Sequence, residues 1–378
     1  MRRLLCLLAA ALAVSALAAA PAPAAAPKVE ARAWYVVNGT TGEVLAKHDA
    51  RMRVAIASIT KLMTVIVALQ HLQPSETVTV SRQAAAVGEE RIPLTAGQRI
   101  SVSDLLAGAL IQSANDAADA LADAAAGGDQ ARFIGWMNAE AQALGLHDTH
   151  FVRPDGLDAP GHLSSAHDVF VLARRAMRIP IVRRLVAERT ATIDDAGISL
   201  DLHTWNDLLG VFPGLVGIKT GHTDDAGWCE VAAAKRPGYT VYAVVLGSPT
   251  RSVRNDALRQ LLSWGVTRYA RVTLVHRTVY GSAAVGYGRG SVPLVASRAL
   301  TALVRSDRPL VRKVVAAASA ALPVRRGERL GTVEVWQGGE LLGKRPLVAA
   351  RAVARPGLGS RIRWYATRTV HDLWGLLP

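Results

Sequence analysis

Cysteine is almost absent from this chain, which has 378 residues and only two cysteines, Cys6 and Cys229. Two cysteines exclude a disulfide-stapled scaffold. Cys6 lies early in an apolar N-terminal run, and its loss with that run would leave no intramolecular disulfide. Cys229 lies in the apolar, strand-like run Trp228–Ala234, and we interpret it as a small buried hydrophobe and not as a catalytic thiol.

Metal-ligand motifs are missing too. The ten histidines show no spacing such as His-Glu-x-x-His, so we expect neither a metal nor a cofactor. Lysine is scarce: seven of the 44 basic residues are lysines and the others are arginines. Half of the residues are hydrophobic and a fifth are charged, which indicates a globular chain long enough for two domains.

The N-terminus has the layout of a signal peptide. Arg2 and Arg3 precede an apolar run from Leu4 to about Leu17, and small residues with Ala-x-Ala cleavage choices follow up to Ala26. We therefore predict a signal peptide over residues 1–26 and an exported protein, on the periplasmic or extracellular face of the cell envelope. An uncleaved membrane anchor is the alternative, but the run is short for a span and prolines follow it closely.

The positive charge is unevenly placed along the chain. The formal net charge is +14, and residues 271–378 alone hold 18 basic and five acidic residues. Such a segregated field favours an anionic partner, either acidic lipid headgroups or an acidic wall polymer. Nucleic acid is not expected, because an exported chain rarely meets it and no recognition motif is present. An arginine bias on a solvated surface remains a plainer explanation.

Residues 27–268 are predicted to form an α/β or α+β domain with strands at both ends and helices between them. Two strands surround the turn at residues 38–42, and a hairpin turn at residues 235–238 separates the runs Trp228–Ala234 and Thr240–Gly247. Apolar residues at three- and four-residue steps predict the following helices: Ser58–Leu69, Val102–Ile111, Ala114–Ala125, Arg132–Leu144, Ala166–Met177 and Arg254–Trp264.

After about residue 268, short runs rich in Val and Leu alternate with Gly, Pro and Arg, which predicts a small basic β domain over residues 269–356. Residues 357–378 form a possible amphipathic tail with arginines mostly off its apolar stripe. Such a helix can lie in a membrane interface or dock on its own domain, and the sequence leaves both open.

The first chemical motif is Ser58-Ile59-Thr60-Lys61, the one Ser-x-x-Lys string in the chain. Residues three apart share a helix face, so Ser58 and Lys61 can meet. A serine hydroxyl becomes nucleophilic when a base removes its proton, and a desolvated lysine can be that base. Arginine could not replace it, because guanidinium stays protonated. We also expect the Ser58 N–H, at a helix start, to stabilise an oxyanion.

Two further motifs follow in order, Ser113-Ala114-Asn115 and Lys219-Thr220-Gly221. A hydroxyl between two helical stretches can relay a proton and an amide can hold a substrate carbonyl. The plainer alternative, compatible with this role, is that Ser113 caps the next helix. Gly221 would let a substrate backbone approach an edge-like strand, where the N–H of His222 is the candidate second oxyanion donor. We expect Lys219 and Thr220 to bind a terminal carboxylate.

These motifs and their surroundings resemble the low-molecular-weight penicillin-binding proteins that are serine-type D-alanyl-D-alanine carboxypeptidases. The resemblance covers roughly residues 30–268 and, more loosely, residues 322–353. It implies a β-lactamase/transpeptidase-like domain with an antiparallel sheet and a helical subdomain, followed by a small all-β domain. The strings that carry it are residues 57–64, 110–117, 137–138, 144–146, 155–157, 217–223 and 323–327.

Carried over to this sequence, the resemblance makes Ser58 the acylated nucleophile, Lys61 its base and Ser113 the proton relay. It makes Asn115 the ligand of the substrate amide, and Lys219 a carboxylate and proton-network residue. Thr220, Gly221 and His222 line the strand side. Arg254 matches an arginine that assists with the terminal carboxylate, with Arg251 as the fallback. The substrate would be a peptidoglycan stem pentapeptide that loses its terminal D-Ala, and β-lactams would acylate Ser58.

The sequence departs from the family pattern at three positions: Ala114 stands where glycine is common, Ile56 where proline is common and Arg153 where asparagine is usual. None of them is a reacting group, although Ala114 could tighten the cleft.

Other functions stay open at this point. A β-lactamase is disfavoured because no Glu-x-x-Leu-Asn string supplies a deacylating glutamate and the second motif lacks the Ser-Asp-Asn form. An endopeptidase or transpeptidase would use the same residues. A non-catalytic wall- or membrane-binding protein would rely on the basic region instead.

Overall fold

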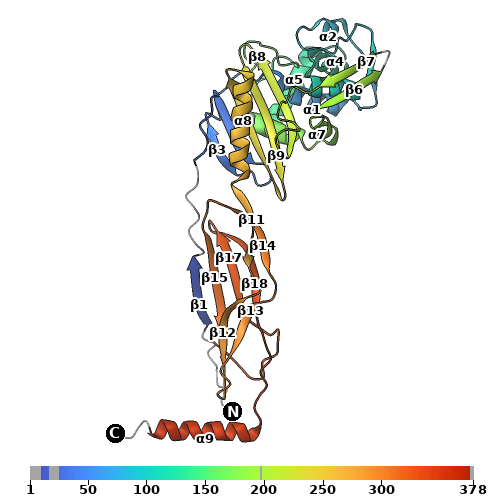
Figure 1. Ribbon diagram of the computed structural model, residues 1–378. Coiled ribbons are helices and arrows are strands. Elements are labelled where there is room, and N and C mark those ends of the chain that lie inside the picture. The colour runs from blue at the N-terminus through green and yellow to red at the C-terminus, as the bar shows by residue number, and fades with distance from the viewer. Residues whose placement is uncertain (1–9, 17–24, 196–197, 375–378) are drawn as a thin grey trace. The chain divides into compact units, whose positions relative to one another are not determined.

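The computed structural model describes residues 10–16, 25–195 and 198–374. The chain divides into two compact units, one covering Ala25–Thr267 and the other covering Arg268 onward together with the N-terminal segment. Figure 1 shows a mixed unit of helices and strands and a unit made mostly of strands.

The first unit is built on a five-stranded antiparallel sheet. Its strand order is β3-β2-β10-β9-β8, with β2 at Ala33–Asn38, β3 at Val44–His48, β8 at Leu215–Thr223, β9 at Gly227–Arg236 and β10 at Tyr239–Ser248. Every residue of β2 is buried, which requires cover on both faces of the sheet. Helix α8 (Arg251–Val266) packs on β9, β10 and β2, and α6 (Ala166–Ala176) also packs on β10 and β2.

Strand β8 lies at the end of the sheet. One of its edges pairs with β9, and its other edge has no partner strand within this five-stranded sheet. The short 3-10 turn η1 (Ala57–Thr60) packs against β8 and leads into helix α1 (Lys61–His71). The core of this unit runs from the sheet into a group of helices that includes α3 (Val102–Ala107), α4 (Asn115–Ala126) and α5 (Gln130–Ala143).

Smaller elements complete the first unit. They are α2 (Arg82–Ala86), α7 (Pro180–Leu185), the π-helix η2 (Gly108–Gln112) and the two-stranded sheets formed by β4 (Thr77–Thr79) with β5 (Arg99–Ser101) and by β6 (Thr190–Asp195) with β7 (Ile198–His203). Sequence periodicity did not reveal most of them because they are short, but the predicted helix Val102–Ile111 covers α3 and most of the π-helix η2.

The second unit has its own apolar core inside two sheets. A seven-stranded sheet has the order β1-β15-β17-β18-β13-β12-β16, and β11 pairs with β14. Their bounds are β1 Ala10–Ala16, β11 Tyr269–Val275, β12 Val279–Val285, β13 Ser291–Ala296, β14 Leu300–Arg305, β15 Leu310–Ala317, β16 Ser319–Ala320, β17 Arg329–Gln337 and β18 Glu340–Ala349.

Both chain ends carry features that the sequence singled out. Most of the predicted signal peptide lies outside the described residues, and its segment Ala10–Ala16 forms β1, antiparallel to β15. Signal cleavage therefore stays a prediction. The predicted tail contains helix α9 (Leu358–Trp374), and its last four residues lie outside the described part. No helix among the described residues is long and apolar enough to cross a membrane.

Candidate active site

Ser58 lies in the 3-10 turn η1, with its side chain partly open to solvent. The sequence predicted that Ser58 opens an α-helix, but the α-helix proper begins three residues later at Lys61. Ala57, just before the serine, has a φ of 48°, a left-handed conformation that is uncommon for residues other than glycine. The tight turn therefore places Ser58 before the first residue of helix α1, where its hydroxyl still contacts Lys61.

The ammonium group of Lys61 is completely buried beneath this serine. Its Nζ donates to Ser58 Oγ at 2.8 Å, to Asn115 Oδ1 at 2.6 Å and to the backbone oxygen of Asp155 at 2.7 Å. Burial lowers the pKa of Lys61 to about 8, although nearby acids such as Asp155 and Asp119 oppose the change. A substantial fraction of Lys61 is thus neutral near pH 8, as a general base requires.

Asn115 ties the helix α4 side of the site together. Its Oδ1 accepts from Lys61, and its Nδ2 donates to the backbone oxygen of Gly88 at 3.1 Å. Its own backbone N–H donates to the backbone oxygen of Glu90 at 2.7 Å. The first residue of α4 therefore fixes both the lysine and the loop at residues 88–90.

Ser113 ends the π-helix η2 in a left-handed conformation, with a φ of 68°. The N-cap of α4 is Ala114, which makes no side-chain capping bond, so the capping role considered for Ser113 is wrong. Its hydroxyl instead accepts a 2.8 Å hydrogen bond from Lys219 Nζ. Lys219 is buried, and this desolvation, with the neighbouring Lys61 charge, lowers its pKa well below the usual value.

Strand β8 passes close to η1 at Gly221. A Cβ added to this glycine would lie 2.9 Å from the backbone oxygen of Ile56 and 3.0 Å from the backbone nitrogen of Ser58. A side chain here would force the strand and the nucleophile apart. Glycine is therefore required to bring the Ser58 N–H next to the strand segment that contains His222.

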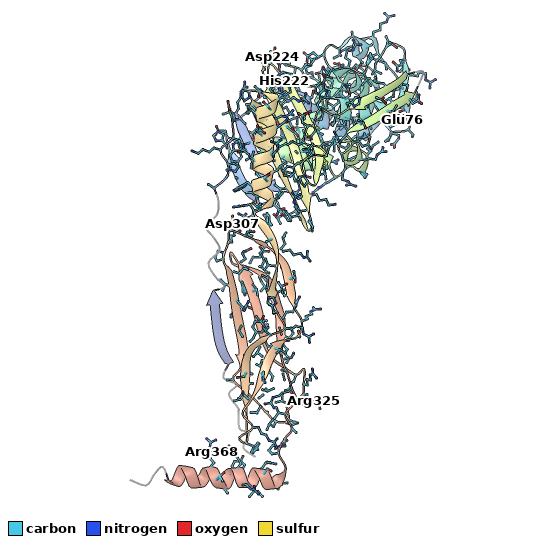
Figure 2. The ribbon with its side chains drawn as sticks, viewed as in Figure 1. Glu76, His222, Asp224, Asp307, Arg325 and Arg368 are labelled. Carbon is cyan, nitrogen blue, oxygen red and sulfur yellow. The ribbon has the colours of Figure 1, made fainter. Side chains whose placement is uncertain are left out.

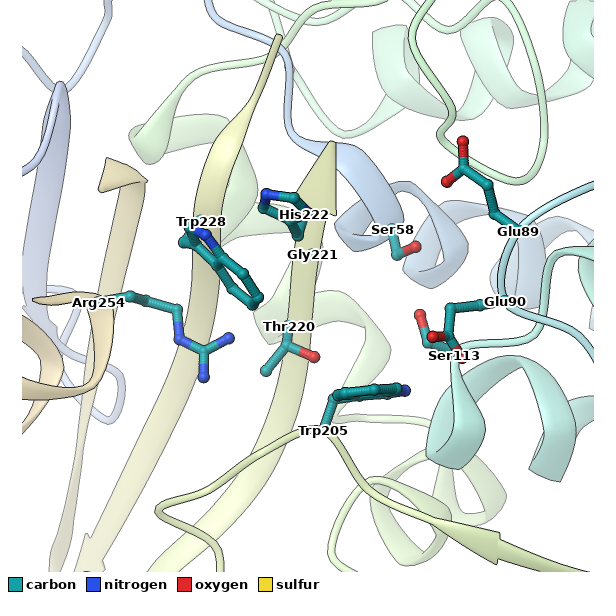
Figure 3. Close-up of a pocket in the computed structure, with 10 residues that line it drawn as sticks. All are labelled: Ser58, Glu89, Glu90, Ser113, Trp205, Thr220, Gly221, His222, Trp228 and Arg254. Carbon is teal, nitrogen blue, oxygen red and sulfur yellow. The ribbon is translucent and has the colours of Figure 1, made fainter. Parts of the chain in front are cut away.

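These residues surround a cavity of about 290 Å³ (Figure 3). In Figure 3, Ser58 and Ser113 lie on one side of the cavity and Thr220 on the other. Arg254 lies beyond Thr220, and Trp205 lies below both serines in this view. The lining residues are Ser58, Glu89, Glu90, Ser113, Trp205, Thr220, Gly221, His222, Trp228 and Arg254.

Arg254 comes from the first turn of α8 and is almost fully buried, with 1% of its surface exposed. Its Nη2 donates to Asp207 Oδ2 at 3.2 Å, and its Nε forms an ion pair with Glu230 Oε2 at 3.1 Å. Arg251 forms an ion pair with Asp207 and does not line the cavity. Of the two candidate arginines, Arg254 is thus the one that reaches the cavity.

Comparison with known proteins identifies the family and the fold of the chain. A family model described as "D-alanyl-D-alanine carboxypeptidase" matches residues 20–250. The chain belongs to this family. A second model, described as "Penicillin-binding protein 5, C-terminal domain", matches residues 269–355. The predicted family, the α+β fold class with an all-β C-terminal region, and a serine-type D-Ala-D-Ala carboxypeptidase as the enzyme class are all confirmed.

Individual relatives of this carboxypeptidase span most of its length. D-alanyl-D-alanine carboxypeptidase DacD from Salmonella typhimurium is 33% identical over 359 residues, which cover 90% of both chains. The crystal structure of DacD from Francisella tularensis has a TM-score of 0.65 at 25% identity and covers 90% of this chain and 97% of that one. Penicillin-binding protein D2 from Listeria monocytogenes, in its ampicillin-bound form, has a TM-score of 0.57 at 33% identity and covers 63% of this chain and 98% of that one.

The carboxypeptidase site also contains residues that sequence reasoning missed. Glu89, Glu90, Trp205 and Trp228 line the cavity, but no motif or periodicity marks them because loops and strand packing bring them there. Glu230 is also new, and its carboxylate is completely buried behind the cavity. The one available signal was a glutamate inside the apolar run Trp228–Ala234.

Arg153, which departs from the family pattern, has a clear structural partner. Its guanidinium donates two 2.6 Å hydrogen bonds to the carboxylate of Asp155, whose backbone oxygen accepts from Lys61. Within the described ranges, no group of three or more His, Cys, Asp and Glu side chains is arranged to hold a metal ion.

Proposed function

We propose that Ser58 is the nucleophile that removes the terminal D-Ala from a peptidoglycan stem pentapeptide. Ser58 Oγ attacks the carbonyl carbon of the penultimate D-Ala, and Lys61 Nζ accepts the hydroxyl proton. The backbone N–H groups of Ser58 and His222 stabilise the oxyanion. The observation that supports this best is the 2.8 Å contact between Lys61 Nζ and Ser58 Oγ in a buried site that depresses the lysine pKa.

The leaving group needs a proton, and we assign its delivery to Ser113. Lys219 and Ser113 are hydrogen-bonded, and the Ser113 hydroxyl faces the same cavity as Ser58. As the C–N bond breaks, the amine of the departing D-Ala receives a proton through Ser113. Asn115 positions the substrate amide, while Lys219, Thr220 and Arg254 bind the terminal carboxylate. Water then hydrolyses the ester at Ser58 and restores the hydroxyl.

The test is D-Ala release from a stem pentapeptide by the wild type and by Ser58→Ala. We expect release by the wild type and a rate lowered at least about a thousandfold in the variant. A folded wild type that releases no D-Ala would overturn the proposal. Intact mass after exposure to ampicillin provides a second readout, since a lasting adduct on Ser58 indicates a penicillin-binding carboxypeptidase and rapid turnover indicates a β-lactamase.

We further propose that the enzyme is exported after loss of residues 1–26 and that its basic C-terminal region rests on an anionic membrane surface. Helix α9 supports this proposal. Its residues Leu358, Ile362 and Tyr365 follow one another at four- and three-residue steps, so they share one face of the helix, and they are 75%, 63% and 54% exposed. Arg361, Arg363 and Arg368 lie on the same helix, and Figure 2 labels Arg368 there. The Cζ atom of Arg361 also lies 5.6 Å from the centroid of the Tyr287 ring. Exposed apolar residues flanked by arginines are typical of interfacial helices.

Cosedimentation with vesicles that contain acidic lipid tests this location. We expect binding to anionic vesicles, weaker binding at high salt, and a several-fold loss in Ile362→Glu. The matched control is Val279→Glu, because Val279 is 60% exposed on β12 and far in sequence from α9. Equal binding by both variants would exclude α9 as the contact.

A further inference from the structure

Glu230 is a completely buried carboxylate that the reaction above does not use. It lies on β9 directly opposite Thr220 of β8, and residues paired in this way project from the same face of a sheet. Thr220 lines the cavity, so the glutamate stands immediately behind the end of the site that we assign to the substrate carboxylate. Neither of its carboxylate oxygens has a hydrogen-bond partner among the described residues.

The neighbour of Glu230 across this face is Arg254. The distance from Arg254 Nε to Glu230 Oε2 is 3.1 Å, and both side chains are almost entirely buried, with exposed fractions of 1% and 0%. The guanidinium also lies over the ring of Trp228, 5.7 Å from its centroid. Glu230 therefore contacts the guanidinium of Arg254, which is one of the cavity residues drawn in Figure 3.

Other partners hold Arg254 in place independently of Glu230. Its Nε and Nη2 donate to Asn255 Oδ1 at 3.1 and 2.6 Å, and its Nη2 donates to Asp207. Removal of the Glu230 charge would thus leave Arg254 in its position and would mainly remove the negative charge that compensates its guanidinium. A Gln side chain at residue 230 would keep the size and an acceptor oxygen.

With Glu230 ionised and no substrate bound, the two arginines at this end of the cavity are balanced by two carboxylates. Arg251 and Arg254 lie in the first turn of α8, where the helix dipole disfavours cations and where no acidic residue of the helix is present. Asp207 and Glu230 supply the two compensating negative charges. An incoming carboxylate adds a further negative charge that these two pairs leave uncompensated.

From this geometry we infer that Glu230 sets the affinity for the carboxylate of the leaving D-Ala by compensating the charge of Arg254. Glu230 is a positioning residue that acts through Arg254, and it does not touch the substrate. When its carboxyl group is ionised, it weakens the attraction of Arg254 for the ligand. When it is protonated, the full charge of Arg254 is available.

Titration of Glu230 makes this control dependent on pH. Burial raises the pKa of its carboxyl group to about 7, and Arg254 opposes the increase. The other charged groups that act on it are Arg251 on α8, Lys219 on β8 and Asp207 in the segment before β8. A bound carboxylate favours the protonated form further, so by linkage the protonated enzyme binds the carboxylate more tightly.

The experiment compares a peptide that ends in D-Ala-D-Ala with the same peptide as its C-terminal amide, between pH 6 and 8. This rests on the proposed carboxypeptidase activity, which the wild type must show first. In the wild type, we expect the ratio of kcat/KM for acid over amide to fall roughly fivefold to tenfold as Glu230 ionises, since one pKa unit of coupling is a factor of ten. Titration of Lys61 changes kcat/KM for both substrates by the same factor, so its effect cancels in the ratio.

Glu230→Gln is expected to flatten this pH dependence to less than about twofold and to lower the KM for the acid at pH 8 by roughly fivefold to tenfold, with kcat little changed. At pH 6 the variant and the wild type should agree. Glu230→Leu, which also removes the charge, should flatten the profile in the same way. Glu140→Gln is the matched control, because Glu140 forms an ion pair with Arg175 at 3.7 Å outside the cavity.

An unchanged KM and pH profile in an active Glu230→Gln enzyme would overturn the inference and leave the carboxypeptidase proposal intact. Should neither variant fold, a wild-type ratio that does not change between pH 6 and 8 would overturn it equally. Absence of D-Ala release by the wild type would instead overturn the proposed function.

Discussion

Lys219 Nζ donates a 2.8 Å hydrogen bond to Ser113 Oγ across 106 positions of sequence. The serine ends a π-helix in the helical part of the first unit, and the lysine belongs to the edge strand of the sheet. This bond therefore joins the two walls of the cavity that Figure 3 shows. It also links two of the three sequence motifs through a single proton-bearing contact.

Ser113→Ala should reduce activity by about a hundredfold to a thousandfold, because it removes the proton relay and leaves the buried Lys219 without that partner. The measurement is D-Ala release together with the acylation rate by ampicillin. Ser113→Thr, which keeps the hydroxyl, is the comparison. If Ser113→Ala kept acylation within about threefold of the wild type, the relay role would be wrong.

The pH dependence of acylation should report Lys61. Its pKa is lowered to about 8, and only the neutral amine accepts a proton. The acylation rate should therefore rise as the pH increases from about 6.5 to 8 and level off above about 9. Stopped-flow acylation over this range checks the midpoint.

Lys61→Arg tests the same role more severely. Guanidinium stays protonated over the whole range, so we expect a loss of about a hundredfold to ten-thousandfold that higher pH does not reverse. Recovery of the variant at high pH would contradict a base at this position.

Gly156 supports the nucleophile turn by its lack of a side chain. Its φ is 87°, and an added Cβ would lie 2.2 Å from the backbone oxygen of Ala57, next to Ser58. Gly156→Ala should therefore lower both the free energy of unfolding and the acylation rate, the latter by at least about tenfold.

Gly97→Ala is the control for Gly156→Ala, because it introduces backbone strain without a steric clash. Gly97 has a φ of 84° with nothing within 4 Å of an added Cβ, so the variant should lose about 1 kcal/mol of stability and keep its acylation rate. Similar activities for the two variants would show that contact with Ala57 does not position Ser58.

His162 should make stability fall in mild acid. Its Nδ1 accepts from the backbone N–H of Val152, so Nε2 carries the proton and donates to Thr60 Oγ1 at 2.8 Å in the nucleophile turn. Burial lowers its pKa from 6.5 to about 4. Well above pH 6.5 the histidine is neutral in both the folded and unfolded states, so it adds no pH dependence there.

Between about pH 6.5 and 4 the unfolded state binds a proton at His162 that the folded state excludes. Stability should therefore decrease as the pH falls through this window, by up to about 3 kcal/mol from this group. Urea unfolding at pH 7, 5.5 and 4.5 measures it. His162→Gln should show a shallower decrease, and an identical pH dependence in the variant would rule out this origin.

The sequence alone determined the family, the fold class, the order of the motifs and the identity of the serine and lysine residues. The family rests on the resemblance of the motif strings to known proteins. The motif residues and the strands follow from local patterns: residues three apart share a helix face, β-rich runs flank turns, and a rare lysine stands where a titratable amine is needed. Helix ends were less predictable, since the strained turn at Ala57 shifts the start of α1 to Lys61.

Only the tertiary structure decided the rest, because it depends on contacts between distant segments. Packing of β8 against η1 at Gly221 brings Ser58 to the strand, and burial, which no sequence pattern measures, lowers the pKa of Lys61 and raises that of Glu230. Packing of α8 on the sheet selects Arg254 over Arg251 and places it against Glu230. The motifs thus specify which groups take part, while desolvation and long-range packing set their charges.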